Sequence, residues 1–411
     1  MGSTLNESEA RDLIFSHAFS RDCAGRVGVE LEWLVDVDGG GTGERSRAGL
    51  TESVSLLARR AGARLAGDSL VSLEPGGQLE LSTRPAGSLS ACVDRAASDL
   101  ATLRALATAQ GLVLRGAGLD DRPPRLRIAH PRYLALDQYY RQVGGQGRAL
   151  LCSTASVQIN VDAGDHSSGW RGRNRRWALV NVLGPVFMAM FANSPTNVRG
   201  RQVRSGRQVL RLATDPARSG PLPPSDDPRS LWAEHALGTR VVAVRSLEDG
   251  AWEVPCGRLT LRRWLRGGGP RPVQASDVRA HLKSLVTPVR ACGHLELRMI
   301  DAQGGDDWVV PLAVVAVLLD DAQSSDAVWR LLGASAVASG RTGWRRAAET
   351  GLSDPALAMV ARTVMHIALE GLPRLGVPSW ALDAVERYAD AYTLRGLSPA
   401  DRRPAGSAAV A

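Results

Sequence analysis

Residues 27–33 read Val-Gly-Val-Glu-Leu-Glu-Trp, so polar and apolar side chains alternate along the stretch. Alternation with a period of two predicts a β-strand, because successive side chains of a pleated strand point to opposite faces. This strand would place Glu30 and Glu32 on one face and its large apolar side chains on the other. The apolar face is therefore expected to pack in a core, while the opposite face presents two carboxylates.

Three later stretches follow the same pattern: residues 78–82 (Gln-Leu-Glu-Leu-Ser), 157–162 (Val-Gln-Ile-Asn-Val-Asp) and 294–299 (His-Leu-Glu-Leu-Arg-Met). One such strand on its own usually belongs to an antiparallel sheet with a solvated face. If the four strands share a sheet, their polar faces form one surface lined with carboxylates and amides. The side chains on that surface would be Glu30, Glu32, Gln78, Glu80, Gln158, Asn160, Asp162, His294, Glu296 and Arg298.

Carboxylates that gather on one surface repel each other unless they are protonated or bind cations. Oxygen ligands favour Mg²⁺ or Mn²⁺, whereas zinc fits less well because the cluster lacks paired His or Cys ligands. Arg298 follows Glu296 by two residues on the same face and would supply the positive charge that phosphoryl oxygens need. The pattern therefore predicts a metal-dependent phosphoryl-transfer site on a sheet.

The composition excludes several other classes. The chain has 411 residues, 50 Lys+Arg against 42 Asp+Glu, a net charge of +8 and a single lysine, Lys283. It contains no G-x-x-x-x-G-K-[ST] motif, which excludes a P-loop. The excess of arginine is more typical of a GC-rich genome than of a nucleic-acid surface, and no helix-turn-helix, RRM or zinc module is visible. We therefore expect no nucleic-acid partner.

The five cysteines stand far apart and form no C-x-x-C motif, which predicts neither a cysteine zinc site nor a disulfide framework. No signal peptide is visible at the N-terminus. The longest apolar stretch, residues 177–192, is shorter than the ~20 residues of a membrane span and is expected to be a buried helix with a kink or break near Pro185. We therefore expect no membrane partner and a cytoplasmic protein.

Helical periodicity is expected over residues 51–65, 88–110, 177–192, 229–237, 276–285 and 309–332, with several more helices after 343. Polar loops are expected at residues 36–49, 163–173, 194–206, 215–229 and 266–272. We assign residues 1–325 to a catalytic core, 326–395 to a helical C-terminal region of the same domain, and 396–411 to a disordered tail.

Five motifs, in order, resemble those of the glutamate–cysteine ligases of plants and actinobacteria. They are residues 28–32, 73–82 (Leu-Glu-Pro-Gly-Gly-Gln-Leu-Glu-Leu-Ser), 155–162, 191–195 (Phe-Ala-Asn-Ser-Pro) and 295–298 (Leu-Glu-Leu-Arg). Residues 148–154 and 293–303 look most like the actinobacterial ligase of ergothioneine biosynthesis. The resemblance spans roughly residues 20–320. It implies an α+β fold like that of glutamine synthetase, in which a curved, mostly antiparallel sheet forms a cradle covered by helices.

The resemblance also implies an activity: ATP- and Mg²⁺-dependent ligation of L-glutamate to L-cysteine, with Mn²⁺ as an alternative ion. The γ-carboxylate of glutamate would attack ATP to give γ-glutamyl phosphate and ADP, and the cysteine amine would displace phosphate. The metal carboxylates would be Glu30, Glu32, Glu74, Glu80 and Glu296. The nucleotide site would include Gln158, Asn160 and Arg298, and the catalytic arginines would be Arg298 for the phosphates and Arg207 for a substrate carboxylate.

Several alternatives stay open from the residues alone. A related carboxylate–amine ligase could use another amine, because acceptor choice would lie in the loops around residues 130–150 and 194–220. A non-catalytic nucleotide-binding paralogue is a further alternative, although the intact set of carboxylates speaks against it. Arg207 could be a solvated loop residue, and His294 could be a ligand or a satisfied hydrogen-bonding residue. The sequence indicates no oligomeric state.

Overall fold

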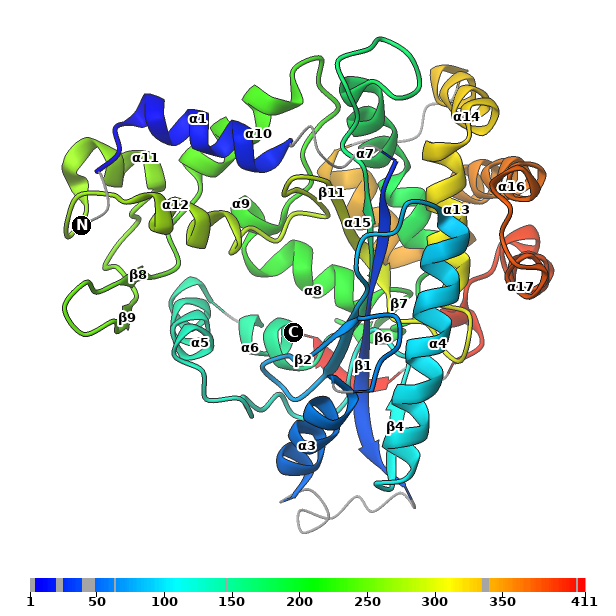
Figure 1. Cartoon of the computed structure of the whole chain (residues 1–411), viewed down its shortest axis with the longest axis horizontal. Coiled ribbons are helices and arrows are strands. Elements are labelled where there is room, and N and C mark those ends of the chain that lie inside the picture. The colour runs from blue at the N-terminus through cyan, green and yellow to red at the C-terminus, as the bar shows by residue number, and fades with distance from the viewer. Residues whose placement is uncertain are drawn as a thin grey trace.

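A sheet of seven strands lies at the centre of the computed structural model, which describes residues 4–19, 25–38, 49–62, 64–144, 146–334, 340–403 and 406–410 (Figure 1). The strand order is β10-β11-β5-β1-β3-β2, with β4 paired to the far half of β1, and every pairing in this sheet is antiparallel. The strands are β1 (Val27–Val37), β2 (Leu70–Leu73), β3 (Leu79–Ser82), β4 (Leu112–Arg115), β5 (Ser156–Val161), β10 (Val289–Ala291) and β11 (Leu295–Asp301).

The four strands expected from alternation are β1, β3, β5 and β11, and they do share this sheet. Glu30 of β1 lies opposite Gln158 of β5, and Glu296 of β11 lies opposite Asn160 of β5. Residues directly opposite each other point to the same face of a sheet. The antiparallel α+β prediction is therefore confirmed, and so is the common polar face.

A β-bulge interrupts β11. Leu297 and Ile300 pair with Ile159 and Val157, so β11 has one residue more than β5 between these pairs. Strict alternation would have pointed Asp301 into the core together with the leucines of β11. After the bulge, Asp301 instead lies on the polar face.

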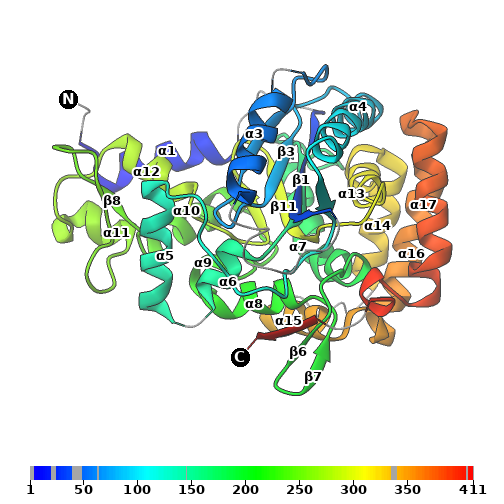
Figure 2. The same cartoon turned by 90° about the horizontal axis from the view of Figure 1, so that it is seen from below.

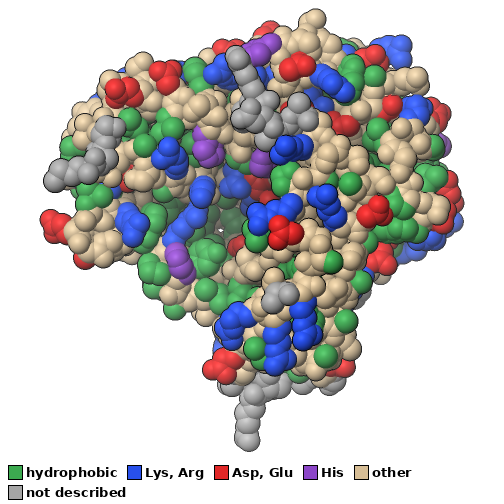
Figure 3. Space-filling model, viewed as in Figure 1, with side chains coloured by type: hydrophobic (Ala, Val, Ile, Leu, Met, Phe, Trp, Pro, Cys, Tyr) green, Lys and Arg blue, Asp and Glu red, His purple; other side chains and the backbone are tan. Residues whose placement is uncertain are grey.

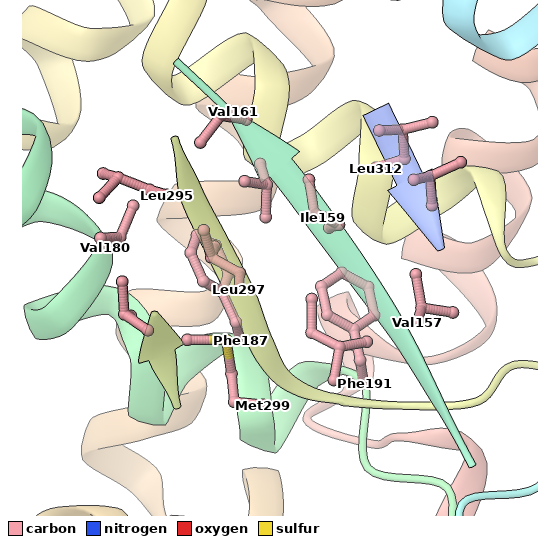
Figure 4. Packing of buried hydrophobic residues seen from close by; sticks show 14 of the residues in the cluster. Val157, Ile159, Val161, Val180, Phe187, Phe191, Leu295, Leu297, Met299 and Leu312 are labelled. Atoms are coloured by element: carbon pink, nitrogen blue, oxygen red, sulfur yellow. The ribbon is translucent and has the colours of Figure 1, made fainter. Parts of the chain in front are cut away.

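Helices cover the apolar face of the sheet in two layers, the first in contact with the strands and the second packed on the first (Figures 1 and 2). Apolar side chains of β5 and β11, among them Ile159 and Leu297, interdigitate with Val180 and Phe187 of α7 and with Leu312 of α13 (Figure 4). These helices are α4 (Leu89–Thr108), α7 (Arg173–Met190), α13 (Val309–Asp320), α14 (Ala322–Ala334), α15 (Arg341–Thr350), α16 (Pro355–Gly371) and α17 (Ser379–Ala391).

The polar face is flanked by shorter helices, with α5 and α8 on the side away from α13 and α16 (Figures 1 and 2). The remaining helices are α1 (Glu7–Ala18), α3 (Leu50–Gly62), α5 (Pro131–Val143), α6 (Gly147–Cys152), α8 (Gly206–Thr214), α9 (Pro216–Ser219), α10 (Pro228–Gly238), α11 (Leu261–Arg263) and α12 (Ala275–Leu282). The short strands are β6 (Thr196–Val198), β7 (Arg201–Val203), β8 (Val244–Arg245), β9 (Trp252–Glu253) and β12 (Gly406–Val410). Single turns are η1 (Trp264–Gly268), η2 (Gly351–Ser353), η3 (Leu372–Leu375), η4 (Thr393–Arg395) and η5 (Pro399–Asp401).

Helix α7 continues through Pro185 to its end, so of the expected kink or break the structure excludes the break. Two other expectations about the helices and loops were wrong in detail. The helix expected at 309–332 is two helices, because the extended Asp321 ends α13 and its carboxylate accepts from the Ser324 backbone N–H at the start of α14. The loop expected at 194–206 contains the hairpin of β6 and β7. Most of the loop expected at 36–49 lies outside the described residues.

The C-terminal region belongs to the same core as the sheet, since α16 and α17 contribute to one hydrophobic cluster with it. The boundary expected at residue 325 falls inside α14, and the division into 1–325 and 326–395 stays a prediction. The tail expected to be disordered from residue 396 differs in the structure, because Pro399 and Ala400 are buried and β12 pairs with β6. In the described part of the chain, no helix is both long and apolar enough to span a membrane.

Candidate active site

A pocket of about 270 Å³ opens on the polar face of the sheet. Its floor carries side chains of β1, β3, β5, β10 and β11 and of the turn before β3. Its other walls come from α5, α6, α8 and the segments that follow α6 and α12. The lining residues are Glu30, Glu32, Glu74, Pro75, Gln78, Glu80, Arg132, Tyr133, Leu136, Tyr140, Leu150, Leu151, Thr154, Gln158, Arg211, Lys283, Val286, Arg290 and Arg298. Figure 3 shows Lys and Arg side chains gathered around a hollow near the centre of the face seen in Figure 1.

Strand β5 holds the two carboxylates of β1 in place. Glu32 accepts hydrogen bonds from Ser156 Oγ at 2.9 Å and from Gln158 Nε2 at 2.6 Å. Glu30 accepts from Asn160 Nδ2 at 3.0 Å. Gln158 also keeps a buried Oε1 without a partner, which leaves one oxygen available for a ligand. The alternation in residues 157–162 thus places amide donors beside the carboxylates that they orient.

Two further carboxylates come from β3 and from the turn before it. Glu80 accepts from Ser72 Oγ at 3.1 Å and from Ser82 Oγ at 2.8 Å. Glu74 lies at the end of β2, where its backbone N–H donates to the carbonyl of Gln78 at 2.9 Å. Four of the five carboxylates expected as metal ligands therefore line one pocket.

The turn at residues 75–77 fixes where Glu74 stands. A Cβ on Gly76 would lie 2.0 Å from the carbonyl oxygen of Cys152, so only glycine fits there. The side chain of Gln78 bridges the turn and the chain after α6, because it accepts from the Gly76 N–H at 2.9 Å and donates to the Thr154 carbonyl at 2.9 Å. Gln78 therefore holds the turn against the chain that follows α6.

Burial and mutual repulsion raise the pKa values of Glu30, Glu74 and Glu80. The pKa of Glu30 rises to about 7 because of its burial and the charge of Glu296. The pKa of Glu74 also rises to about 7, from burial and the charge of Glu32. Burial and the charge of Glu74 raise the pKa of Glu80 well above its usual range. Each of these three carboxyl groups is therefore held where its charge is disfavoured by burial and by a neighbouring carboxylate.

Glu296 has a different environment from the other carboxylates. It is fully buried and forms ion pairs with Arg290 and Arg298. Although burial disfavours its charge, the two guanidinium groups hold the pKa of Glu296 at about 2. Glu296 does not line the pocket, whereas Arg298 does. The ion pair therefore fixes Arg298 beside the carboxylates of β1.

His294 acts in this structure as a hydrogen-bonding residue. Its Nε2 lies 3.0 Å from Asn160 Oδ1 and 3.5 Å from the sulfur of Cys292. The contact with Asn160 leaves the amide nitrogen of that residue facing Glu30. Of the two roles left open by the sequence, the structure therefore supports the hydrogen-bonding one.

Arg207 lies on α8 and is fully buried, so the solvated-loop alternative for this residue is wrong. Its guanidinium donates to the carbonyl of Arg298 at 2.9 Å and to that of Ile300 at 3.3 Å, and it pairs with Asp301 at 3.5 Å. Arg207 is not among the residues that line the pocket. It holds α8 against the bulge of β11. A pocket arginine that the sequence reasoning missed, Arg211, stands one helical turn later.

The motif at residues 191–195 lies behind the pocket. Asp301 accepts from the backbone N–H of Asn193 at 2.9 Å, from Ser194 Oγ at 2.7 Å and from Ser205 Oγ at 3.0 Å. These bonds join the start of α8 to the end of β11. The motif therefore supports the site without lining it.

The donor set fits a hard divalent cation better than zinc. Glu30, Glu32, Glu74 and Glu80 all present oxygen atoms to the pocket, and Gln158 adds its unpartnered carbonyl oxygen. As the described side chains stand, no three His, Cys, Asp or Glu residues are grouped to hold a metal ion. An ion that enters would therefore have to draw the carboxylates together.

Known proteins similar to this chain share most of its length. The family described as glutamate-cysteine ligase family 2 (GCS2) matches residues 26–402. The glutamate–cysteine ligase EgtA of Mycobacterium tuberculosis H37Rv is 34% identical over 387 residues, which cover 92% of this chain and 85% of that protein. EgtA of Mycolicibacterium smegmatis is 36% identical over 322 residues, 75% of this chain and 72% of that protein.

More distant likenesses extend to plant proteins and to solved structures. The chloroplastic glutamate–cysteine ligase of Arabidopsis thaliana is 29% identical over 353 residues, 82% of this chain and 65% of that protein. Among solved structures, the complex between the prokaryotic ubiquitin-like protein Pup and its ligase PafA matches with a TM-score of 0.44 and 9% identity. That match covers 89% of this chain and 63% of the other.

Proposed function

The chain belongs to glutamate-cysteine ligase family 2, and from that premise we propose that it joins the γ-carboxylate of L-glutamate to the amine of L-cysteine at the expense of ATP. The products would be γ-glutamylcysteine, ADP and phosphate. The single observation that carries the proposal is the pocket in which four carboxylates, the amide of Gln158 and the ion-paired Arg298 face one another. The likeness to EgtA supports a supply of γ-glutamylcysteine to ergothioneine biosynthesis, in the cytoplasm.

The chemistry of the reaction explains why such a pocket is needed. A carboxylate is a poor acyl donor, so it must be phosphorylated before an amine attacks it. Negative charge then spreads over the phosphoryl oxygens, and groups held in place beforehand stabilise it best. Arg298 is held in this way by Glu296, so we assign it to the transferring phosphoryl group.

We assign Glu30, Glu32, Glu74 and Glu80 to Mg²⁺, or Mn²⁺, that enters with ATP. When bound, the ion would neutralise phosphate oxygens and replace the protons that the raised pKa values favour. Gln158 would add an oxygen at the nucleotide. Asn160 would orient Glu30, since its amide donates to that carboxylate. Glu296 is the fifth expected metal ligand, but it already pairs with two arginines. We therefore assign it the role of holding Arg298 in place.

The experiment is ADP release by the purified protein with ATP, Mg²⁺, glutamate and a panel of amines. We expect cysteine to stimulate release more than any other amine, with γ-glutamylcysteine found by mass spectrometry. Stronger stimulation by another amine would make the protein a related carboxylate–amine ligase. No stimulation by any amine would favour the non-catalytic alternative.

A further inference from the structure

Arg211 is a buried cation that faces the pocket without a carboxylate partner. Its side chain is 5% exposed, and it belongs to the residues that line the pocket. Nη1 donates to the carbonyl of Val286 at 2.9 Å, while the buried Nε has no hydrogen-bond partner. In the part of the chain that the structure describes, no Asp or Glu forms an ion pair with it. A buried charge is normally paired, so this one lacks its partner.

The two neighbouring arginines differ from Arg211 because each of them has a carboxylate partner. Arg207 pairs with Asp301, and Arg298 pairs with Glu296, so both of these cations are neutralised by the protein. Burial, and then the positive charges of Arg207 and Arg298, lower the pKa of Arg211 well below its usual range. The charge of Glu32 offsets this only in part, so Arg211 is left to be neutralised by an anion that enters the pocket.

Helix α8 brings Arg211 to this place. Arg207 and Arg211 are four residues apart and share one helix face. The bonds from Arg207 to the carbonyls of Arg298 and Ile300 fasten the first turn of α8 to β11. The second turn then projects Arg211 into the pocket, where Val286 receives one of its N–H groups. Arg211 is thus held in position before any ligand binds.

The surroundings of Arg211 indicate which anion it takes. The carboxylates on the sheet suit a metal ion and its phosphates, whereas Arg211 comes from α8, a wall that the strands do not build. Nearby side chains of α5 that line the pocket, Leu136 and Tyr140, offer apolar surface. A planar guanidinium matches a carboxylate with two parallel N–H groups. Both amino-acid substrates carry an α-carboxylate that does not react.

We propose that Arg211 binds the unreactive α-carboxylate of an amino-acid substrate, and so selects α-amino acids over simple amines or acids. This inference rests on the proposed ligase function. The α-carboxylate could belong to glutamate or to cysteine, and both present the same chemistry to the guanidinium. Arg207, the arginine expected to bind a substrate carboxylate, would instead support Arg211 from one turn away.

The test compares natural substrates with analogues that lack only the α-carboxylate: 4-aminobutyrate in place of glutamate, and cysteamine in place of cysteine. We expect Arg211→Gln to lower kcat/KM about 10- to 100-fold for the substrate whose carboxylate it binds. The analogue of that substrate should have a low kcat/KM with the wild type, and the same low kcat/KM with the variant. If the substitution leaves kcat/KM unchanged for 4-aminobutyrate, Arg211 binds the carboxylate of glutamate. If it leaves kcat/KM unchanged for cysteamine, Arg211 binds the carboxylate of cysteine. Equal losses for substrates and analogues would overturn the inference.

Binding and stability provide readouts that do not need turnover. Arg211→Gln removes an unneutralised buried cation, so the melting temperature without ligand should stay level or rise. Arg207→Gln, the matched control on the same helix, breaks a paired cation and should lower it. The rise in melting temperature caused by the bound amino acid should vanish in Arg211→Gln and return in part in Arg211→Lys.

The same measurements separate this inference from the proposed function. If the wild type ligates cysteine but Arg211→Gln keeps full affinity for both amino acids, only the role of Arg211 is wrong. If the wild type ligates no amine, yet binds glutamate or cysteine through Arg211, only the ligase proposal is wrong. Should Arg211→Gln fail to fold, unchanged affinity of Arg211→Lys for both amino acids would also count against the role.

Discussion

Glu32 of β1 lies directly opposite Glu80 of β3 in the antiparallel ladder. Two like charges at directly opposed positions destabilise a strand pair, and burial raises the cost of each charge. A structure that keeps this pair must offset the repulsion with a proton or a cation. The pair thus connects the stability of the β1–β3 pairing to the ligand that the pocket takes.

Glu80→Gln should therefore stabilise the metal-free protein and abolish its activity. We expect its free energy of unfolding to rise by on the order of 1 kcal/mol, because one of two opposed carboxylates is gone. Mg²⁺ should raise the melting temperature of the wild type more than that of the variant. Differential scanning fluorimetry with and without Mg²⁺, together with ADP release, checks this.

The control for this prediction is Glu253→Gln on the exposed strand β9, which should change neither stability nor activity. Wild-type turnover by Glu80→Gln would rule out a metal-binding role for this carboxylate.

Arg298→Ala should lower kcat about 100- to 1,000-fold with a small effect on the KM of glutamate, since it removes a group placed for the transferring phosphoryl. Arg290 still pairs with Glu296 in this variant, so the fold should persist. Arg207→Ala should mainly lower the free energy of unfolding, because it removes the guanidinium that donates a hydrogen bond to the Arg298 carbonyl. Steady-state kinetics and urea unfolding of both variants distinguish the two outcomes. Equal, small kinetic losses in both would argue against a phosphate role for Arg298.

The sequence predicted the strands well because alternation is a local signal. Residues 27–33 and 157–162 read as strands with polar faces, and these faces do meet on one sheet. The bulge in β11 could not be predicted in this way, since it is a property of the pairing between two strands. It moves Asp301 from the core to the polar face, where that residue organises the start of α8.

The burial of the arginines of α8 could not be predicted for a related reason. A buried arginine looks like a surface residue in any pattern based on polarity, and residues 194–206, just before this helix, read as a polar loop. Arg207 and Arg211 are nevertheless among the most buried charged residues described. The spacing of four between them would have been informative only once residues 206–214 were recognised as helical.

Gly76→Ala should displace the turn that carries Glu74. The added Cβ would meet the Cys152 carbonyl at 2.0 Å, so the backbone must move at a cost of about 1–3 kcal/mol. We expect lower stability and a weaker apparent affinity for Mg²⁺, measured by urea unfolding and by metal titration of activity. Gly87→Ala is the matched control, because nothing lies within 4 Å of its Cβ and its φ is not positive. Equal stability of the two variants would show that the contact with Cys152 does not hold the turn.

Acid should destabilise the protein through the buried His281 and the partly buried His235, neither of which lines the pocket. Burial lowers the pKa of His281 to about 3 and that of His235 to about 4, and the Nε2 of His281 lies 2.8 Å from the Ala236 carbonyl. Below their ordinary pKa of about 6.5, both imidazoles take up protons when the chain unfolds but stay neutral in the folded state. Their contribution to stability is therefore complete above pH 6.5 and is lost as the pH falls toward 4 and 3. Urea unfolding of the wild type and of His281→Gln at pH 7 and pH 5 checks this, and the variant should lose less stability between the two. If both lose the same amount, the neutral buried state of His281 is not what acid disturbs.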